Sequence, residues 1–400
     1  MILASSRPSA ARASRPRGAQ RTIAFFASVL VAAVTLSACA PPTPTAGETG
    51  TTAAASPQQG PVAACTDGTS GKLKLPADWQ AADPAANPVA KGTPNHGPVT
   101  VNTDGITLPI VAPAPTPQLP TTVASCDGET VEVADVSRIV TIDLHGTLTE
   151  IVYALGLGAN VVGRDRAADF KQAQGATVVT PMGHDLNAEA ITALNPSVVL
   201  TDTTIGPLEV QEQLRAVGIP VIFFDPSRTM AGISHQITAV AQAMGVPAAG
   251  VELNGMVGAD MAAALSAVPA DSTPVRIAFL YVRGTAGVYL MAGPGSGADD
   301  IIKSVGATDV GTDIGLTMPF TQLTSEALIN ASPDVLLLMT GGLESVGGPE
   351  GLAKIQGIAQ TPAGADRRII DVADGTLLSF GPRSGQIVKA LAEAVHGVKS

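Results

Sequence analysis

Three side chains of this sequence have the chemistry of metal ligands or of their immediate partners. His184 carries an imidazole in a loop that runs into a predicted helix, and Tyr281 carries a phenol in an apolar stretch that predicts a strand. Arg283 follows two residues later, so it shares a strand face with Tyr281, and a cation there favours phenolate. Imidazole and phenolate both bind transition metals. The ordinary alternatives are a surface or capping histidine and a tyrosine in normal strand packing.

The sequence contains no recognisable catalytic motif. HExxH, GxSxG and P-loop patterns do not occur, and the glycine-rich run 293–297 is by itself weak evidence for phosphate binding. A zinc hydrolase that uses Asp143, His145 and His184 is the enzymatic alternative, but these residues lack a close ligand spacing. We therefore expect a binding protein and not an enzyme.

Residues 1–38 have the features of an export signal. Five arginines are the only charges before Cys39, and an apolar run from Ile23 to Leu36 follows them. This run is shorter than the roughly 20 residues of a membrane-spanning helix, and Leu36-Ser37-Ala38-Cys39 has the pattern of a bacterial lipobox. We expect an exported chain with a lipid on Cys39, anchored to the outer face of the cytoplasmic membrane. A cysteine that merely follows a signal is the alternative.

The chain after this signal is strongly acidic. It holds 18 basic and 34 acidic residues, a net charge of −16 with neutral histidines. Such a surface repels phosphate backbones, so nucleic acid is not an expected partner. Cys65 and Cys126 form an even pair in an exported chain, which favours a disulfide over two free thiols.

Composition divides the rest of the chain into four parts. Residues 39–126 are rich in Pro, Thr, Ala and Gly and predict a flexible tether. We expect an N-terminal α/β lobe at 127–246, a connecting helix at 247–269 and a C-terminal α/β lobe at 270–400. The stretch 247–265 contains no turn signal, which supports the helix.

An internal repeat predicts that the two lobes have related plans. Residues 189–200 recur as residues 326–337, and each copy predicts a short helix, a proline and a buried parallel strand. A looser, helix-like echo precedes each copy at 148–158 and 298–307. The expected fold class is α/β, with two Rossmann-like lobes joined by one long helix.

This layout resembles the metal-chelate class of substrate-binding proteins, class III of the periplasmic-binding-protein fold. The resemblance covers about residues 131–400 and includes Ser137-Arg138-Ile139-Val140, 148–157, Val162-Gly163 and the repeat. Within that class the C-terminal half resembles the haem branch, the HmuT-type lipoproteins, at 338–343, 361–364, Arg367-Arg368 and 377–383. This resemblance implies a receptor of a high-GC Gram-positive bacterium that serves iron acquisition. The receptor would take haem, free or from surface haem-binding proteins, to an ABC permease and its ATPase.

The haem resemblance assigns roles to the candidate ligands. His184 from one lobe and Tyr281 from the other would bind the haem iron, with Arg283 donating a hydrogen bond to the tyrosine oxygen. Many relatives outside the Gram-positive lineage carry tyrosine where this chain has His184. This departure replaces an anion by a neutral imidazole and so favours a second, anionic ligand.

Other residues are secondary candidates for the haem pocket, and each has a structural alternative. They are His145, Met291, Met339, Phe320, Arg164 and Arg383. The apolar side chains suit porphyrin faces, Met339 could be an alternate axial ligand, and guanidinium groups suit propionates. Core packing and structural salt bridges are the alternatives.

Two further predictions concern docking and cargo. By position, the acidic residues that would meet the permease are Glu209 and Asp309, with solvated helix charges as the alternative. The same fold could instead carry a ferric siderophore or cobalamin. A siderophore site more often presents several Arg and Trp residues, whereas the single tryptophan here lies in the tether.

Overall fold

A computed structural model describes residues 62–65, 96–181, 183–269 and 274–397. All of them belong to one compact unit that spans Pro57–Ser400. The signal segment, Cys39 and the tether residues 40–61 and 66–95 lie outside the described residues, so the predictions made for them remain predictions. No helix in the described ranges is both long and apolar enough to cross a membrane.

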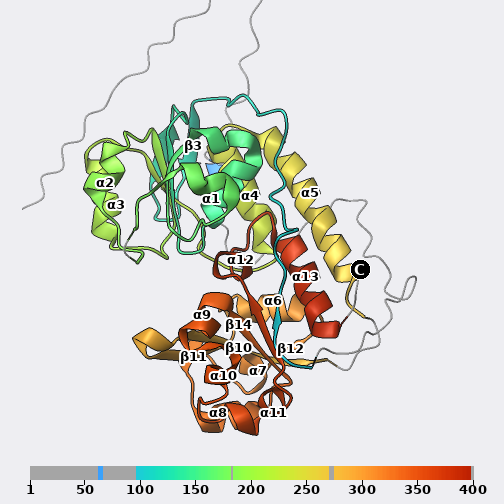
Figure 1. Cartoon of the computed structure of the whole chain (residues 1–400). Coiled ribbons are helices and arrows are strands. Elements are labelled where there is room, and N and C mark those ends of the chain that lie inside the picture. Colours follow the sequence, from blue (N-terminus) through green and yellow to red (C-terminus); the bar gives the residue numbers. More distant parts are fainter. Residues whose placement is uncertain (1–61, 66–95, 182, 270–273, 398–400) are drawn as a thin grey trace, which may run out of the picture. The chain divides into compact units, whose positions relative to one another are not determined.

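The N-terminal lobe contains a parallel five-stranded sheet (Figure 1). Its strands, in the order β7-β6-β5-β8-β9, are β5 (Ile139–Ile142), β6 (Val161–Arg164), β7 (Thr177–Val178), β8 (Val198–Thr201) and β9 (Val221–Phe223). Its helices are α1 (Thr147–Val152), η1 (Tyr153–Leu157), η2 (Gly158–Asn160), η3 (Lys171–Gly175), α2 (Ala188–Ala193), α3 (Leu208–Ala216) and α4 (Gly232–Ala243). One sheet face packs in a core with α2 and α3, and the other with α1 and α4. This two-sided cover explains why β5, β8 and β9 are fully buried.

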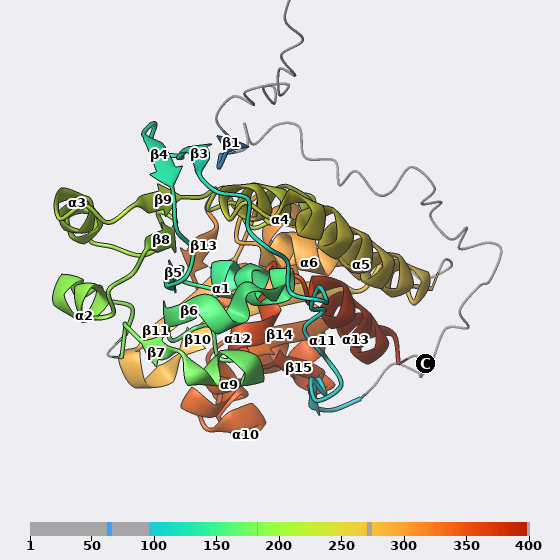
Figure 2. The same ribbon diagram turned by 90° about the horizontal axis from the view of Figure 1, so that it is seen from above.

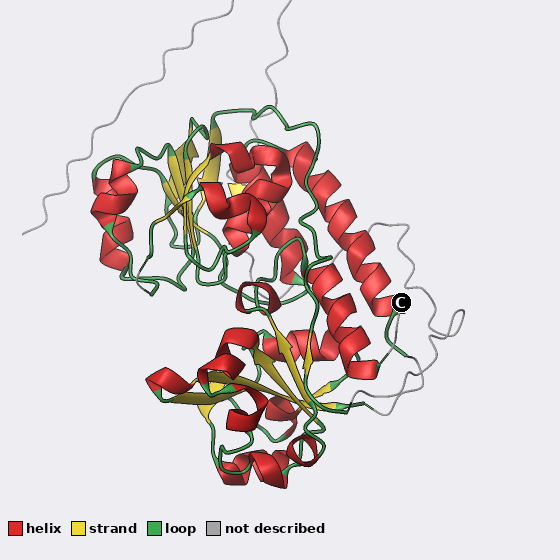
Figure 3. Ribbon diagram, in the orientation of Figure 1, coloured by secondary structure: helices red, strands yellow, loops and turns green. Residues whose placement is uncertain are grey.

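The C-terminal lobe is built around a mixed sheet (Figure 3). Its strands, in the order β13-β11-β10-β14-β15-β2 with β12 beside β10, are β2 (Val99–Thr100), β10 (Arg276–Arg283), β11 (Val288–Ala292), β12 (Thr308–Asp309), β13 (Phe320–Gln322), β14 (Val335–Met339) and β15 (Ile369–Val372). Its helices are η4 (Gly284–Ala286), α6 (Ala298–Ser304), α7 (Val310–Asp313), α8 (Ser325–Ala331), α9 (Thr340–Ser345), α10 (Gly348–Leu352), η5 (Ile358–Gln360), α11 (Pro362–Ala365), α12 (Asp374–Leu377) and α13 (Ser384–His396). β10, β14, β15 and β2 run parallel, whereas β11 runs antiparallel to β10 and β13.

The repeat and the connecting helix are where the sequence predicts them. The repeat copies form α2 with β8 and α8 with β14, and the two strands pair with β5 and β10 respectively. The connecting helix is α5 (Pro247–Ser266), which begins with proline in its first turn, where the missing N–H costs nothing. It packs against α4 of one lobe and α13 of the other (Figure 2). A Cβ on Gly385 would approach the Asp260 carbonyl carbon to 2.6 Å, so this glycine permits the close contact of α13 with α5.

The tether boundary at residue 126 needs correction, because residues 96–126 pack on the folded body. We call residues 99–120 the strap. At its start β2 extends the C-terminal sheet beside β15, and Val101 N donates to Asp371 O at 2.8 Å. Further along, Val111 N donates to Ala154 O and Gln118 N to Gly245 O, both at 2.8 Å. Backbone pairing therefore holds this Pro-rich segment on both lobes.

A small sheet follows the strap at the edge of the N-terminal lobe. It consists of β1 (Val62–Ala63), β3 (Thr121–Ala124) and β4 (Thr130–Val133). The predicted disulfide joins Cys65 to Cys126, and Cys126 N donates to Phe223 O at 2.9 Å, which attaches the small sheet to β9.

Polar contacts also join the two lobes directly. Glu150 of α1 forms a buried ion pair with Arg383, which precedes α13. The Thr147 hydroxyl donates to the Ser379 carbonyl, and Met230 N donates to Asp300 at 2.5 Å. Arg383 was expected to be a propionate partner, but its charge is already used in this ion pair. The salt-bridge alternative is therefore correct for Arg383.

Candidate functional site

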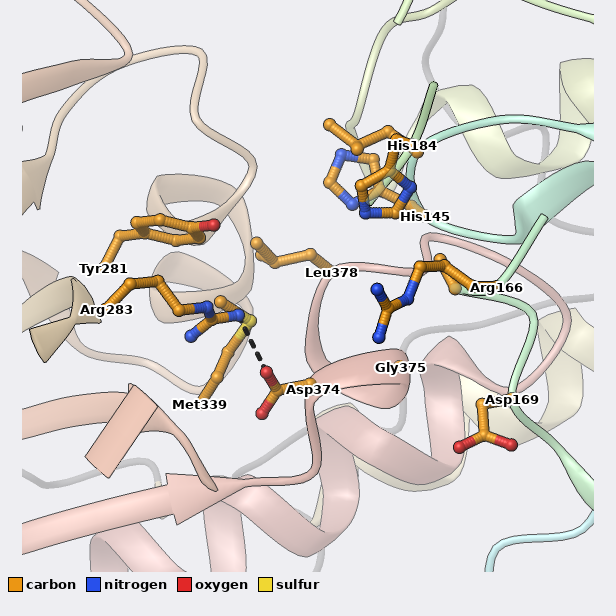
Figure 4. A pocket seen from close by; sticks show the side chains of 12 residues that line it. His145, Arg166, Asp169, His184, Tyr281, Arg283, Met339, Asp374, Gly375 and Leu378 are labelled. Atoms are coloured by element: carbon orange, nitrogen blue, oxygen red, sulfur yellow. Dashed lines mark hydrogen bonds and ion pairs between the residues drawn. The ribbon is translucent and has the colours of Figure 1, made fainter. Parts of the chain in front are cut away.

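A cavity of about 480 Å³ lies between the lobes and collects side chains from the ends of several strands. The N-terminal lobe contributes Leu144 and His145 after β5, Arg166, Ala167 and Asp169 after β6, and His184 after β7. The C-terminal lobe contributes Tyr281 and Arg283 from β10, Met339 from the end of β14, and Asp374, Gly375 and Leu378 after β15. These are the carboxyl ends of parallel strands, where ligands of α/β proteins bind. Figure 4 shows the two groups facing a common space.

His184 is oriented by a carboxylate from the neighbouring strand end. Its Nδ1 lies 3.1 Å from both carboxylate oxygens of Asp165, which is fully buried. Because a carboxylate can only accept, Nδ1 carries the proton of the neutral ring, and Nε2 keeps a free lone pair. The imidazole is 38% exposed and lines the cavity, so it is available to a ligand.

Tyr281 lines the opposite side of the cavity beside Arg283. The guanidinium lies over the tyrosine ring, 4.8 Å from its centroid, and pairs with Asp374 at 2.8 Å. The predicted shared face is present, but Arg283 stacks on the ring and donates to Asp374 and the Val282 carbonyl instead of the tyrosine oxygen. Phe320 meets the same ring edge-on at 5.9 Å, so it supports Tyr281 without itself being among the residues that line the cavity.

Behind the cavity wall lies a buried charged cluster. Asp143 accepts hydrogen bonds from Thr147 N at 2.9 Å and Leu148 N at 3.0 Å, and so caps α1. Arg228 reaches Asp202 at 2.8 Å and Asp143 at 3.8 Å. Burial, with the charge of Asp202 second, raises the pKa of Asp143 to about 6. The cluster leaves Asp143 incompletely compensated by the single arginine.

His145 stands between this cluster and the cavity. Its backbone N donates to Asp143 at 3.1 Å, and its ring is among the residues that line the cavity. Burial, then the charge of Arg228, then that of His184 lower the pKa of His145 to about 3. The ring is therefore neutral at pH 7 and offers a second imidazole lone pair beside His184. Among the described residues, no group of three or more His, Cys, Asp or Glu side chains is arranged to hold a bare metal ion.

Besides Arg283, a second arginine lines the cavity, and it is not Arg164 or Arg383, the two expected to pair with propionates. Arg166 points into the space, whereas Arg164 donates to the Ala173 and Asp165 carbonyls and is buried (Figure 4). Arg164 was therefore wrong as a pocket residue, because its guanidinium satisfies backbone carbonyls. The signal that could have found Arg166 is its place just past the carboxyl end of β6.

Of the two methionine candidates, one lines the cavity and the other lies in the core. Met339 is 6% exposed and lines the cavity, with its sulfur turned toward Arg283 and Asp374 in Figure 4. Met291 is 1% exposed in a core cluster of the C-terminal lobe, so its assignment to the pocket was wrong. Alternation along β11 explains the burial, since Met291 lies on the strand face that packs with Val310 and Leu328.

The two proposed docking residues also differ. Glu209 is exposed in the first turn of α3, where its charge is free to meet another surface. Asp309 is 3% exposed and accepts from Thr312 N at 2.8 Å as the N-cap of α7. Because a buried cap cannot reach a partner protein, Asp309 was wrong as a docking residue.

Comparison with known proteins gives one family. The family model described as periplasmic binding protein matches residues 142–374, more than half of the chain. A crystal structure of the heme binding protein HmuT is 36% identical and covers 75% of this chain and 97% of that chain, with a TM-score of 0.71. The periplasmic heme-binding protein RhuT from Roseiflexus sp. RS-1, in its apo form, is 39% identical over 66% of this chain and 99% of that chain, with a TM-score of 0.62.

One relative is described as binding a different ligand. A cobalamin-binding protein of Halobacterium salinarum is 26% identical over 202 residues, which are 50% of this chain and 53% of the relative. The chain thus spans about half the length of this relative.

Proposed function

Because this chain belongs to the periplasmic binding protein family, we propose that it is an extracytoplasmic receptor that captures haem and delivers it to an ABC importer. The similarity to two heme-binding proteins over nearly their whole length supports haem as the cargo. It outweighs the cobalamin-binding relative, which matches at lower identity and over half of its own length.

One observation carries the proposal: an imidazole and a phenol, one from each lobe, line the same cavity. His184 presents Nε2 because Asp165 occupies the other ring nitrogen. Tyr281 presents its hydroxyl toward the same space, and the Arg283 guanidinium stacks on its ring (Figure 4). We propose these two as the axial ligands of ferric haem, with Arg283 supporting Tyr281.

The rest of the cavity suits a porphyrin with carboxylate substituents. Leu144, Leu378 and Met339 offer apolar contact, and the side chain of Arg166 takes no part in the ion pairs found among the described residues. We propose that Arg166 pairs with a propionate, the role that the sequence analysis gave to Arg164 and Arg383.

Haem titration of the purified chain tests the cargo and the ligands. Wild type should develop a Soret band at one haem per chain, and His184→Ala and Tyr281→Ala should each weaken retention and shift the band. His235→Ala, exposed on α4, and Tyr289→Phe, on β11 outside this cavity, are the matched controls. No spectral change in wild type, together with tight cobalamin binding, would replace haem by cobalamin. Unchanged bands in both ligand variants would remove the ligand assignment.

Export and docking complete the proposal. A lipid on Cys39 would hold the receptor beside the permease, and exposed Glu209 would meet a basic residue of that permease. Cys39→Ala should release the chain from the membrane fraction, and Glu209→Lys should reduce haem uptake by cells without changing haem binding in solution. Retention of the Cys39 variant in the membrane, or unchanged uptake with Glu209→Lys, would contradict these assignments.

A further inference from the structure

A single buried carboxylate organises the loop that carries His184. Asp165 directly follows β6 and is 0% exposed. Its Oδ1 accepts from Ala167 N at 2.7 Å, and its Oδ2 accepts from the Thr180 hydroxyl at 2.5 Å. Both oxygens lie 3.1 Å from His184 Nδ1. The same carboxylate therefore holds the start of the loop, at Thr180, and the imidazole four residues later.

Among the residues that the structure describes, the charge of Asp165 faces the histidine and forms no ion pair with an arginine or lysine. Within the described part of the chain, His184 is its ion-pair partner. The preceding Arg164 turns away and donates to the Ala173 carbonyl at 2.9 Å. A buried carboxylate without a cation is costly, so its charge is most stabilised when the imidazole itself becomes more positive. Electron donation from His184 to a bound metal has this effect.

From this geometry we propose that Asp165 is a positioning residue for the haem iron, acting through His184. The inference rests on the proposed function, since it deepens the role of the same site. The carboxylate fixes the tautomer, keeps Nε2 directed into the cavity and increases electron donation from the ring. A more donating ligand stabilises ferric over ferrous iron.

A purely structural role is the competing interpretation, and it makes a different prediction. A carboxylate that only held the loop together would affect haem binding whether or not His184 were present. A carboxylate that acts through the imidazole loses its effect once the imidazole is gone. A double-mutant cycle separates the two interpretations.

The first experiment measures haem affinity and the ferric/ferrous midpoint potential of the full chain with Asp165→Asn. Asparagine keeps the shape but removes the charge, and we expect an affinity loss of about 10- to 100-fold and a more positive potential. In the His184→Ala background the same change should have little further effect. Asp135→Asn is the matched control, because Asp135 also accepts from a backbone N–H and a hydroxyl, both of Ser137, but is exposed outside the cavity.

Thr180→Val keeps the inference testable if Asp165→Asn does not fold. It removes a donor from the carboxylate, which should then attract the imidazole proton more strongly and shift the potential negative. An unchanged affinity and potential in Asp165→Asn, an equal loss in the His184→Ala background, or a positive shift in Thr180→Val would each overturn the role of Asp165. A wild-type chain that binds no haem would instead overturn the proposed function.

Discussion

His145→Gln should change how the stability of the ligand-free protein depends on pH. In the folded chain, burial and the charge of Arg228 lower the pKa of His145 to about 3, from 6.5 in the unfolded chain. Between these values the unfolded state binds a proton that the folded state does not. The contribution of His145 to stability is therefore present above pH 6.5 and is lost progressively as the pH falls toward 3.

The size of this effect follows from the two pKa values. At pH 5, one and a half pH units below 6.5, the loss would reach about 2 kcal/mol. His145 lines a cavity that water can enter, so screening reduces it, and about 1–2 kcal/mol is the expected range. Glutamine has no proton to gain, so the variant should lack this loss.

Titration of Asp143 changes the stability in the opposite direction, so its contribution has to be separated from that of His145. Its pKa is raised from 3.8 to about 6, so its contribution is fully present below pH 3.8 and is lost as the pH rises through 6. Acidification thus stabilises the fold through Asp143 while it destabilises the fold through His145. The wild-type profile alone would show little, and only the difference between wild type and variant isolates His145.

Urea unfolding at pH 7 and pH 5 provides the measurement. On going from pH 7 to pH 5, the unfolding free energy of His145→Gln should rise by about 1–2 kcal/mol relative to that of wild type. His235→Gln, which replaces an exposed imidazole on α4, reports the generic effect of losing a histidine. Parallel profiles for wild type and His145→Gln would refute the reasoning.

Three further outcomes are expected. Glu150→Gln should lower the free energy of unfolding by about 3 kcal/mol in urea titrations, because Arg383 would be left buried without its partner. Adding Arg383→Leu should recover part of the loss, and a fully stable single variant would contradict this expectation. Arg166→Ala should weaken haem binding about tenfold while the Soret band stays in place, since a propionate contact does not touch the iron; a displaced band would argue against a propionate role. Replacing Cys65 and Cys126 by serine should lower the unfolding free energy by up to about 4 kcal/mol, because the disulfide closes a loop between cysteines 61 residues apart. An unchanged urea midpoint would show that the disulfide does not constrain the unfolded chain.

The sequence predicts most of the fold because its signals are local. The repeated helix–proline–strand pattern locates α2 with β8 and α8 with β14, and the uninterrupted stretch from Pro247 locates α5. The strap was missed because its signals are not local. Val101 pairs with Asp371, and Gln386 bonds both the N and the O of Thr107 at 2.9 Å, across more than 260 residues in each case. Nothing in a Pro-rich stretch reveals partners so distant.

The same limit applies to the site. His184 and Tyr281 are recognisable by chemistry and by family resemblance, and both line the cavity. Arg164 and Arg166 look equivalent in the sequence, yet one bonds backbone carbonyls while the other points into the cavity. The turn after β6 decides between them, and it depends on the burial of Asp165. Side-chain direction past the end of a strand is set by such tertiary contacts.

The strap has a consequence for how the protein is handled at the bench. A shortened chain that begins at residue 127, where composition alone would place the start of the first lobe, would lack β2. The apolar edge of β15 would then be open, and an uncovered edge strand is a template for pairing with other chains. Self-association of such a truncated preparation would reflect the missing strand and would say nothing about the oligomeric state of the intact receptor.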